Sequence, residues 1–274
     1  MNMTFSFESA ELQFKQILEE YFISVYPEKS LASHGIGHHR RVWNYAKELT
    51  LLLIDRHLIE DSFSPSKMII ACYLHDIGMS VDSGIRHGHH SREICTRFLE
   101  KRNLKISSYD DVLQAIENHD NKEYITSAGK HNLLTILSVA DDLDAFGFTG
   151  IYRYSEIYLM RGINYRDIGN LIKENVKGRF DNFVKTFGFS DELVQKHKKR
   201  YDTLVYFFDK YNNQVLSYHF GSRHPSGYCG VVEIINYITT KRTTFQDMLN
   251  GTLKESPDRI FRWFIVGIIS DSNY

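Results

Sequence analysis

The chain has 274 residues, of which 42% are hydrophobic and 24% charged, a composition typical of a soluble globular protein with a sizeable core. Its formal net charge of -1 provides no basic field for nucleic-acid binding, and no apolar run reaches the length of a membrane span. Three cysteines without CxxC spacing predict reduced thiols in a cytoplasmic protein, and the N-terminal stretch lacks the pattern of a signal peptide.

Helical spacing of apolar residues dominates the first half of the chain. Amphipathic helices are predicted at 8–26 and 39–59, joined by a glycine-broken loop at 31–38. Ser64 followed by Pro65 marks the start of a third helix, which is expected to end at Gly78. Further helices, separated by polar connections, are predicted at 89–101, 108–119 and 132–146.

The second half of the chain continues the helical pattern at 151–161, 166–187 and 190–217. The stretch HFGSRHPSG, 219–227, is the best candidate linker. Segments 228–250 and 256–270 are rich in Tyr, Ile, Val and Thr, which leaves both a helix and a strand open for each. We predict an all-α protein, with one domain at 1–190 and a mostly helical C-terminal extension at 191–274 that covers a cleft or pairs subunits in a homo-oligomer.

Histidines gather in the N-terminal half: eight of the 13 fall between His34 and His90, and His119 follows before the middle of the chain. His75 and Asp76 stand side by side in the apolar stretch CYLHDIGMS, 72–80. Burying such a pair is costly unless both side chains have partners. A divalent metal ion satisfies both at once, because imidazole and carboxylate groups are good ligands for such ions.

Six side chains at predicted helix ends could converge on one site in a helical bundle. Four histidines and two carboxylates are too many for one tetrahedral ion with an open position. They suit two ions that share a bridging carboxylate and a bridging water. The six candidate ligands are His38, His75, Asp76, His87, His119 and Asp141.

Over roughly residues 30–150, the ordered set resembles the HD superfamily of metal-dependent phosphohydrolases. The motifs that carry the resemblance are HxxxV at 38–42, LHDIG at 74–78 and VADDLDA at 139–145. The resemblance implies an all-α HD-domain bundle with His38, His75, Asp76 and Asp141 as metal ligands. His87 and His119 match histidines that two-metal members add, among them the diadenosine-tetraphosphate hydrolases and the HD-GYP phosphodiesterases.

Three departures from the motifs of related families narrow the range of expected substrates. Met79 stands where HD-GYP proteins usually have Lys, and NKEYITSAG follows His119 in place of a GYP element, so cyclic di-GMP is disfavoured as a substrate. The paired acids that ppGpp hydrolases place just after the HD pair are absent as well.

Several assignments have competitors in the sequence. His39 competes with His38, which is preferred because it lies one turn before the buried position Val42. Asp142 competes with Asp141, and Asp144 is interpreted as a supporting or capping residue. His89 and His90 compete with His87. The alternative for His75 and Asp76 is a helix-capping histidine beside a solvated acid. For His87, His89 and His90 it is three solvated loop histidines, and for His119 a polar residue at a helix end.

The predicted reaction is hydrolysis of a phosphomonoester or phosphodiester bond. Nucleotides are the expected substrates, and two divalent ions (Mn, Fe, Ni, Co or Mg) are expected to activate water. Asp76 and His34 are the predicted catalytic residues. His34 resembles a histidine that some family members place beside the substrate, where it could protonate the leaving oxygen. Arg41, Arg86 and Lys122 are predicted to bind phosphate, with exposed helix charges as the alternative interpretation.

Two other functions remain open. Some proteins with the same ligand order hold two irons and are oxygenases, and a non-catalytic domain of this fold could bind a nucleotide as a sensor. The expected partner is a small phosphorylated molecule, with no membrane and no strong nucleic-acid signal.

Overall fold

The computed structural model describes residues 3–26, 31–59, 63–121, 131–241 and 258–272, and these form eleven α-helices, three short 3-10 helices and no strand. The chain divides into two compact units. The first comprises residues 1–30 and 34–143, and the second comprises 31–33 and 144–274. The predicted all-α class is confirmed over the described part of the chain.

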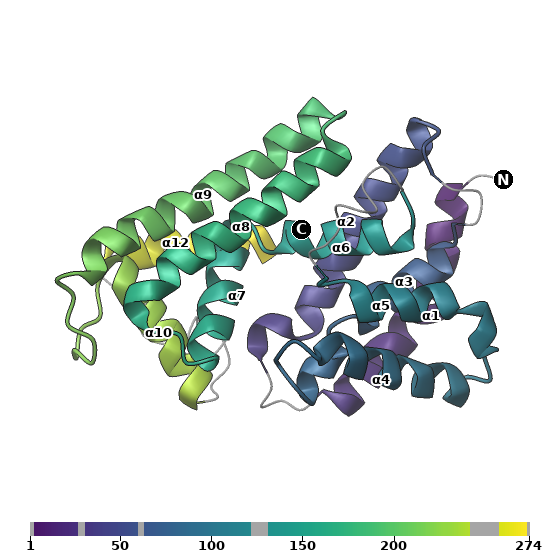
Figure 1. Cartoon of the computed structure of the whole chain (residues 1–274), viewed down its shortest axis with the longest axis horizontal. Helices are drawn as coiled ribbons and strands as arrows, with labels where there is room; N and C mark the ends of the chain where they lie inside the picture. The colour runs from purple at the N-terminus through teal and green to yellow at the C-terminus, as the bar shows by residue number, and fades with distance from the viewer. Residues whose placement is uncertain (1–2, 27–30, 60–62, 122–130, 242–257, 273–274) are drawn as a thin grey trace. The chain divides into compact units, whose positions relative to one another are not determined.

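The first unit is built around a short central helix, α3, which packs against α1, α2 and α5 (Figure 1). Residues 68–74 of α3 are fully buried, because this helix has apolar side chains on every face. The C-terminal end of α3 therefore lies inside the protein. The helices of this unit are α1 (Met3–Val25), α2 (Ile36–Asp55), α3 (Pro65–Leu74), α4 (His87–Lys101), α5 (Asp110–Asn118) and α6 (Leu133–Asp144).

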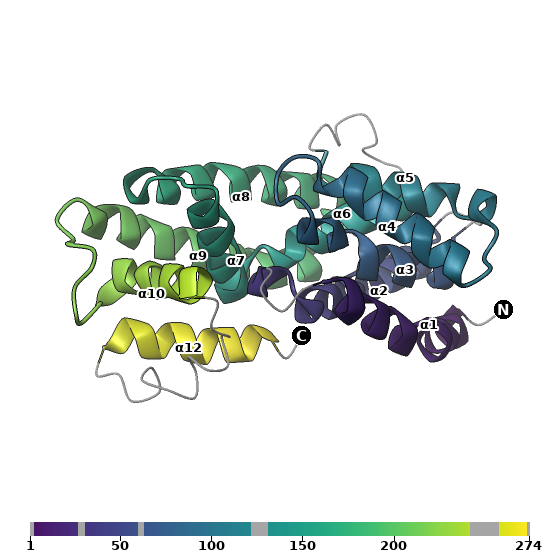
Figure 2. The same ribbon diagram turned by 90° about the horizontal axis from the view of Figure 1, so that it is seen from below.

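The second unit is centred on α7, which packs against α8, α9, α10 and α12. Figure 2 shows α10 and α12 side by side in light green and yellow, and these two helices contact each other. Phe207, Phe208 and Phe264 are among the large side chains buried in its core. The helices are α7 (Gly147–Met160), α8 (Tyr165–Phe187), α9 (Asp191–Val215), α10 (Gly227–Lys241) and α12 (Arg259–Ser272).

Some helix bounds differ from those predicted. The third helix ends at Leu74 rather than at Gly78, and the chain continues through a turn into the 3-10 helix η2 (Ile77–Ser80). The fourth helix begins at His87, so that residue lies in a helix and not in the preceding loop. Of the segments left open between helix and strand, the described residues 228–241 and 259–270 are helical. The boundary predicted between residues 190 and 191 lies in the short connection between α8 and α9, within the second unit.

None of the described helices is both long enough and apolar enough to cross a membrane. The three cysteines are free and buried.

Candidate metal centre

Each of the six predicted ligands lies at or beside a helix end. His38 is in the first turn of α2, and His87 is the first residue of α4. His75 and His119 are the C-cap residues of α3 and α5, and Asp76 follows His75. Asp141 is in the last turn of α6. All six side chains are at most 5% exposed. The helix ends therefore place them in the buried interior of the protein.

The first cluster consists of His38, His75, Asp76 and Asp141, whose ligand atoms all lie within 4.8 Å of one another. The Nε2 atoms of His38 and His75 are 3.1 Å apart. Asp76 Oδ2 is 3.4 Å from His38 Nε2 and 3.5 Å from His75 Nε2. Asp141 Oδ1 completes the group at 3.6 Å from His38 Nε2.

The second cluster uses the other oxygen of the same carboxylate. Asp76 Oδ1 lies 3.0 Å from His119 Nε2 and 3.3 Å from His87 Nε2, and these two nitrogens are 3.4 Å apart. Asp76 is thus common to both clusters and presents one oxygen to each. This is the geometry expected of a carboxylate that bridges two ions.

The orientation of three histidines is set by backbone carbonyl groups. His75 Nδ1 lies 3.0 Å from Cys72 O, His87 Nδ1 lies 2.7 Å from Gly84 O, and His119 Nδ1 lies 2.7 Å from Ile116 O. A carbonyl oxygen only accepts, so Nδ1 carries a proton in each ring, and Nε2 is the nitrogen left to hold a second proton or to bind a metal ion. Metal-bound histidines commonly donate their second nitrogen to a carbonyl in this way.

The donor set fits divalent ions on a structural criterion. Two neutral imidazoles that point Nε2 lone pairs at each other repel unless a proton or a cation lies between them. The Nε2 atoms of His87 and His119 are 3.4 Å apart, so a proton or a metal ion has to lie between them. A cation bound between the rings and Asp76 would remove the repulsion and neutralise the buried carboxylate.

Electrostatics within the centre are dominated by burial and by Asp76. Burial raises the pKa of Asp76, but nearby His75 and hydrogen bonds from three other histidines outweigh it, and the pKa is held well below its ordinary value. Burial lowers the pKa of His75. Burial lowers the pKa of His119, but the hydrogen bond to Asp76 and the negative charges of nearby aspartates together outweigh burial and raise this pKa to about 9. Asp76 therefore remains an anion throughout the range in which proteins function.

Two glycines allow the helices to approach closely enough to form the second cluster. A Cβ atom at Gly78 would lie 2.2 Å from the carbonyl oxygen of His87 and 2.5 Å from the amide nitrogen of Ser91. The Gly78 N–H donates to Ser91 Oγ at 2.8 Å. A Cβ atom at Gly88 would lie 2.6 Å from the carbonyl oxygen of Glu117. Larger residues at these positions would push α4 away from its neighbours.

His34, the predicted proton donor, lies beside the first cluster. It is the last residue of the 3-10 helix η1 (Ala32–His34) and is 4% exposed. Its Nε2 atom is 4.0 Å from Asp76 Oδ2, and its ring centroid is 5.4 Å from that of His38. The structure therefore brings His34 together with the six clustered residues.

The histidines that competed with the predicted ligands in the sequence contact other partners. His89 is 56% exposed in its side chain and contacts Glu117 Oε1 at 3.1 Å, and His90 contacts Glu93. His39 is fully buried and could join His38 and His75 in a third ligand group. Its Nδ1 atom lies 3.1 Å from Cys72 O, and its ring packs against Phe22. Sequence reasoning treated His39 only as a substitute for His38 and did not foresee that both are buried.

The competing acids are buried as well. Asp142 and Asp144 are fully buried, and Asp144 Oδ2 accepts a hydrogen bond from Arg153 Nη1 at 3.1 Å. Asp144 thus has the supporting contact that its place in the motif suggested, and Asp141 is the acid that faces His38 and His75.

The predicted phosphate-binding residues are not gathered in the same way. Arg41 is partly exposed one turn after His38 on α2. The Arg86 side chain is 77% exposed, and its Nε atom lies 3.6 Å from Asp82 Oδ2. Lys122 lies outside the described residues. The role of all three in substrate binding remains a prediction.

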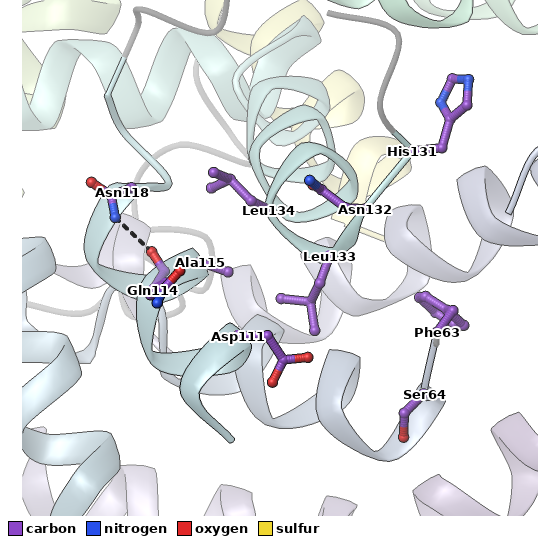
Figure 3. Close-up of a pocket in the computed structure, with 10 residues that line it drawn as sticks. All are labelled: Phe63, Ser64, Asp111, Gln114, Ala115, Asn118, His131, Asn132, Leu133 and Leu134. Carbon is purple, nitrogen blue, oxygen red and sulfur yellow. Dashed lines mark hydrogen bonds between the residues drawn. The ribbon is translucent and has the colours of Figure 1, made fainter. Parts of the chain in front are cut away.

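A cavity of about 320 Å³ lies in the first unit, between α5 and the N-terminal ends of α3 and α6. Figure 3 shows Gln114 and Asn118 of α5 on one side and Leu133 and Leu134 of α6 across from them. None of the six clustered residues lines it, although Asn118 directly precedes His119. The cavity is therefore a neighbour of the centre along α5 and is not part of it.

Comparison with known proteins finds one family model that matches part of the chain. The family model that matches is described as HD domain, and the match covers residues 35–145. This range contains both clusters. No curated protein and no solved structure matches the chain.

Proposed function

We propose that the chain is a phosphohydrolase with two divalent ions, because residues 35–145 match the model of the HD-domain family, whose members are commonly metal-dependent hydrolases. The observation that carries the proposal is the pair of clusters around Asp76, each of which receives one carboxylate oxygen. The proposed reaction is hydrolysis of a phosphomonoester or phosphodiester bond of a nucleotide, in the cytoplasm.

The residues that would hold the ions divide between the two clusters. His38, His75 and Asp141 would hold one ion, His87 and His119 would hold the other, and Asp76 would bridge them. When bound, the two ions supply a water of lowered pKa and positive charge that stabilises the phosphoryl oxygens. With three or four protein ligands at each ion, coordination positions remain for water and substrate.

The remaining chemistry falls to side chains near the clusters. His34, 4.0 Å from Asp76 Oδ2, is proposed to direct its Nε2 atom at the leaving oxygen and to hold the proton that this oxygen accepts. Arg41 and Lys122 are proposed to contact the phosphate and Arg86 to approach it from the loop before α4, since guanidinium and ammonium groups match phosphate charge.

Metal content and a substrate screen test the proposal directly. We expect purified protein to carry close to two ions per chain by elemental analysis, and to hydrolyse at least one phosphorylated metabolite when loaded with Mn, Fe, Ni, Co or Mg. Absence of metal together with no gain in thermal stability on adding any of these ions would refute the metal centre. Metal without turnover of any phosphate ester would refute the reaction.

A di-iron oxygenase is the second candidate, because imidazole and carboxylate ligands with open positions also suit iron and oxygen chemistry. Iron content, a visible absorption band and oxygen consumption distinguish it from a phosphohydrolase. Nucleotide binding without turnover in metal-loaded protein would instead indicate a sensor domain.

A further inference from the structure

His39 of α2 is a fully buried histidine directly after the proposed ligand His38. Its Nδ1 atom lies 3.1 Å from the carbonyl oxygen of Cys72 in α3. Its ring centroid is 4.5 Å from that of Phe22 in α1 and 5.1 Å from that of His75. Because a carbonyl oxygen only accepts, Nδ1 carries a proton and donates it to Cys72. A side chain of α2 is thus hydrogen-bonded to the backbone near the end of α3.

The second ring nitrogen of His39 has no comparable contact. Nε2 is buried and has no hydrogen-bond partner among the described residues. A buried polar atom without a partner costs stability, and an apolar side chain at this position would avoid that cost. Packing alone therefore does not explain a histidine here. The contact that an imidazole makes and a leucine could not make is the one from Nδ1 to Cys72 O.

The carbonyl group of Cys72 is shared by two histidines. His75 Nδ1 lies 3.0 Å from the same oxygen, whose two lone pairs can accept both protons. In a continuing helix this oxygen would accept from the backbone N–H four residues on, that of Asp76. The last backbone bond of α3 runs from His75 N to Ala71 O at 3.0 Å, and Asp76 follows outside the helix with φ −107° and ψ 6°. The two imidazoles bind the carbonyl at the point where the chain leaves α3.

Consecutive residues of α2 therefore contact the first cluster and the backbone beside it. The Nε2 atom of His38 lies 3.1 Å from that of His75, and His39 donates to Cys72 O. Helices α2 and α3 pack against each other within the first unit. The separation of the two ligand nitrogens depends on how the start of α2 is held against the end of α3, and the hydrogen bond from His39 joins these two helix ends.

We infer that His39 is a positioning residue for the ion of the first cluster: its hydrogen bond to Cys72 O holds α2 against the end of α3 and so sets the separation of His38 and His75. The inference rests on the proposed two-ion function and adds to it a residue that acts through two ligands without binding an ion itself. Its effect should therefore appear in metal binding before any substrate is added.

Three substitutions of His39 separate the roles of the two ring nitrogens. The side-chain nitrogen of asparagine can take the place of Nδ1, that of glutamine can take the place of Nε2, and leucine has no donor. Each protein is freed of metal with a chelator and titrated with Co²⁺. Removing a hydrogen-bond partner that orients metal ligands commonly costs about tenfold to a hundredfold in metal affinity.

We expect His39→Leu and His39→Gln to weaken one of the two binding steps by about tenfold to a hundredfold and to leave the other within about threefold of wild type. The absorption spectrum of bound Co²⁺, which depends on the ligand geometry, should change in the same two variants. His39→Asn should restore both the affinity and the spectrum, a rescue that a purely structural role in packing would not predict.

Thr50→Val is the matched control. Thr50 is also fully buried in α2, and its Oγ1 atom donates to Ala46 O at 2.7 Å. The variant thus removes a buried hydrogen bond to a backbone carbonyl group on the same helix, outside both clusters. Both binding steps and the Co²⁺ spectrum should remain those of wild type. Thermal melting of the metal-free proteins checks that each variant is folded.

The inference would be overturned by a His39→Leu protein that binds both ions as wild type does. Equal weakening by asparagine and leucine would also overturn it, because the site would then need the ring or Nε2 and not the Nδ1 donor. If leucine prevents folding, the comparison of His39→Asn with His39→Gln decides between these outcomes. Wild-type protein that binds both ions but hydrolyses no phosphate ester would instead refute the proposed reaction, and the titrations would be unaffected.

Discussion

Asp76 presents a different oxygen to each histidine cluster, and the two clusters are connected through it. The motif pattern was sufficient to predict that His75 and Asp76 act together, because adjacent metal-binding groups on an apolar segment need common partners. The motif pattern could not show that the two carboxylate oxygens of Asp76 face different clusters. This depends on the orientation of the Asp76 side chain just after the end of α3.

Asp76→Ala should abolish turnover and leave the fold intact. Loss of the bridge removes a ligand from both proposed ions at once, whereas the fold is held by the buried helices around α3. Phosphatase rate and circular dichroism measure the two effects, with Asp111→Ala, an exposed acid paired with Lys67, as the control. Activity above a tenth of wild type would exclude Asp76 as the bridge, since tenfold corresponds to only about 1.4 kcal/mol of barrier.

His87→Ala and His119→Ala should each lower the metal content toward one ion per chain and strongly reduce turnover. Both rings contact Asp76 Oδ1, whereas the ligands of the first cluster are untouched by either change. His89→Ala and His90→Ala are matched controls from the same helix, and their side chains face Glu117 and Glu93. Wild-type metal stoichiometry in His87→Ala and His119→Ala would show a mononuclear site.

Helix ends determine where the ligands lie. The sequence predicted some of these ends correctly and others incorrectly. The start of α3 at Pro65 follows from local chemistry, because proline is favoured in the first turn. The end of α3 does not, because the helix stops at Leu74 while the glycine that suggested a later end, Gly78, serves a close approach to α4. Helices α10 and α12 were left open for a related reason. Several of their β-branched residues, among them Val232 and Ile265, are buried, and burial outweighs local propensity.

Gly78→Ala should destabilise the protein by about 1–3 kcal/mol, the usual cost of an overpacked site, and weaken the second cluster more than the first. The added methyl group would meet the backbone of His87 and Ser91 and move α4 away from η2. Urea unfolding and metal stoichiometry measure both effects.

Gly178→Ala is the control for this prediction. Gly178 lies in α8 with no atom within 4 Å of an added Cβ, so alanine there should be neutral or stabilising by up to about 1 kcal/mol. Equal stability and equal metal content in Gly78→Ala and wild type would contradict the role given to this glycine.

At the scale of the whole molecule, the division into two units has no marker in the sequence. The chain passes from the first unit to the second at residues 143 and 144, within the last turn of α6 and without a polar linker. Residues 31–33 belong to the second unit although they lie far from its other residues in the sequence. Composition can reveal a linker, but it cannot reveal a boundary that falls inside a helix or a short segment bound by a distant side chain.

The stability of the molecule should fall at mildly acidic pH, in part because of His197 in α9. Burial, together with the nearby charges of Arg200 and Lys196, lowers the pKa of His197 to about 2, whereas the unfolded value is near 6.5. Below pH 6.5 the unfolded chain therefore binds a proton that the folded protein does not, and the loss of stability continues until the pH approaches 2. Between pH 7 and pH 5 this single histidine should lower the free energy of unfolding by about 2 kcal/mol.

His197→Gln isolates that contribution, because the variant keeps a polar side chain but has no titrating group at this position. Urea unfolding of wild type and variant at pH 7 and pH 5, both with a chelator so that metal release does not contribute, should show a smaller loss in the variant by about 2 kcal/mol. The histidines of the metal centre are common to both proteins and cancel in the comparison. Parallel losses of stability would mean that His197 becomes protonated in the folded protein, which its full burial beside the Arg200 guanidinium, 3.4 Å from Nδ1, should prevent.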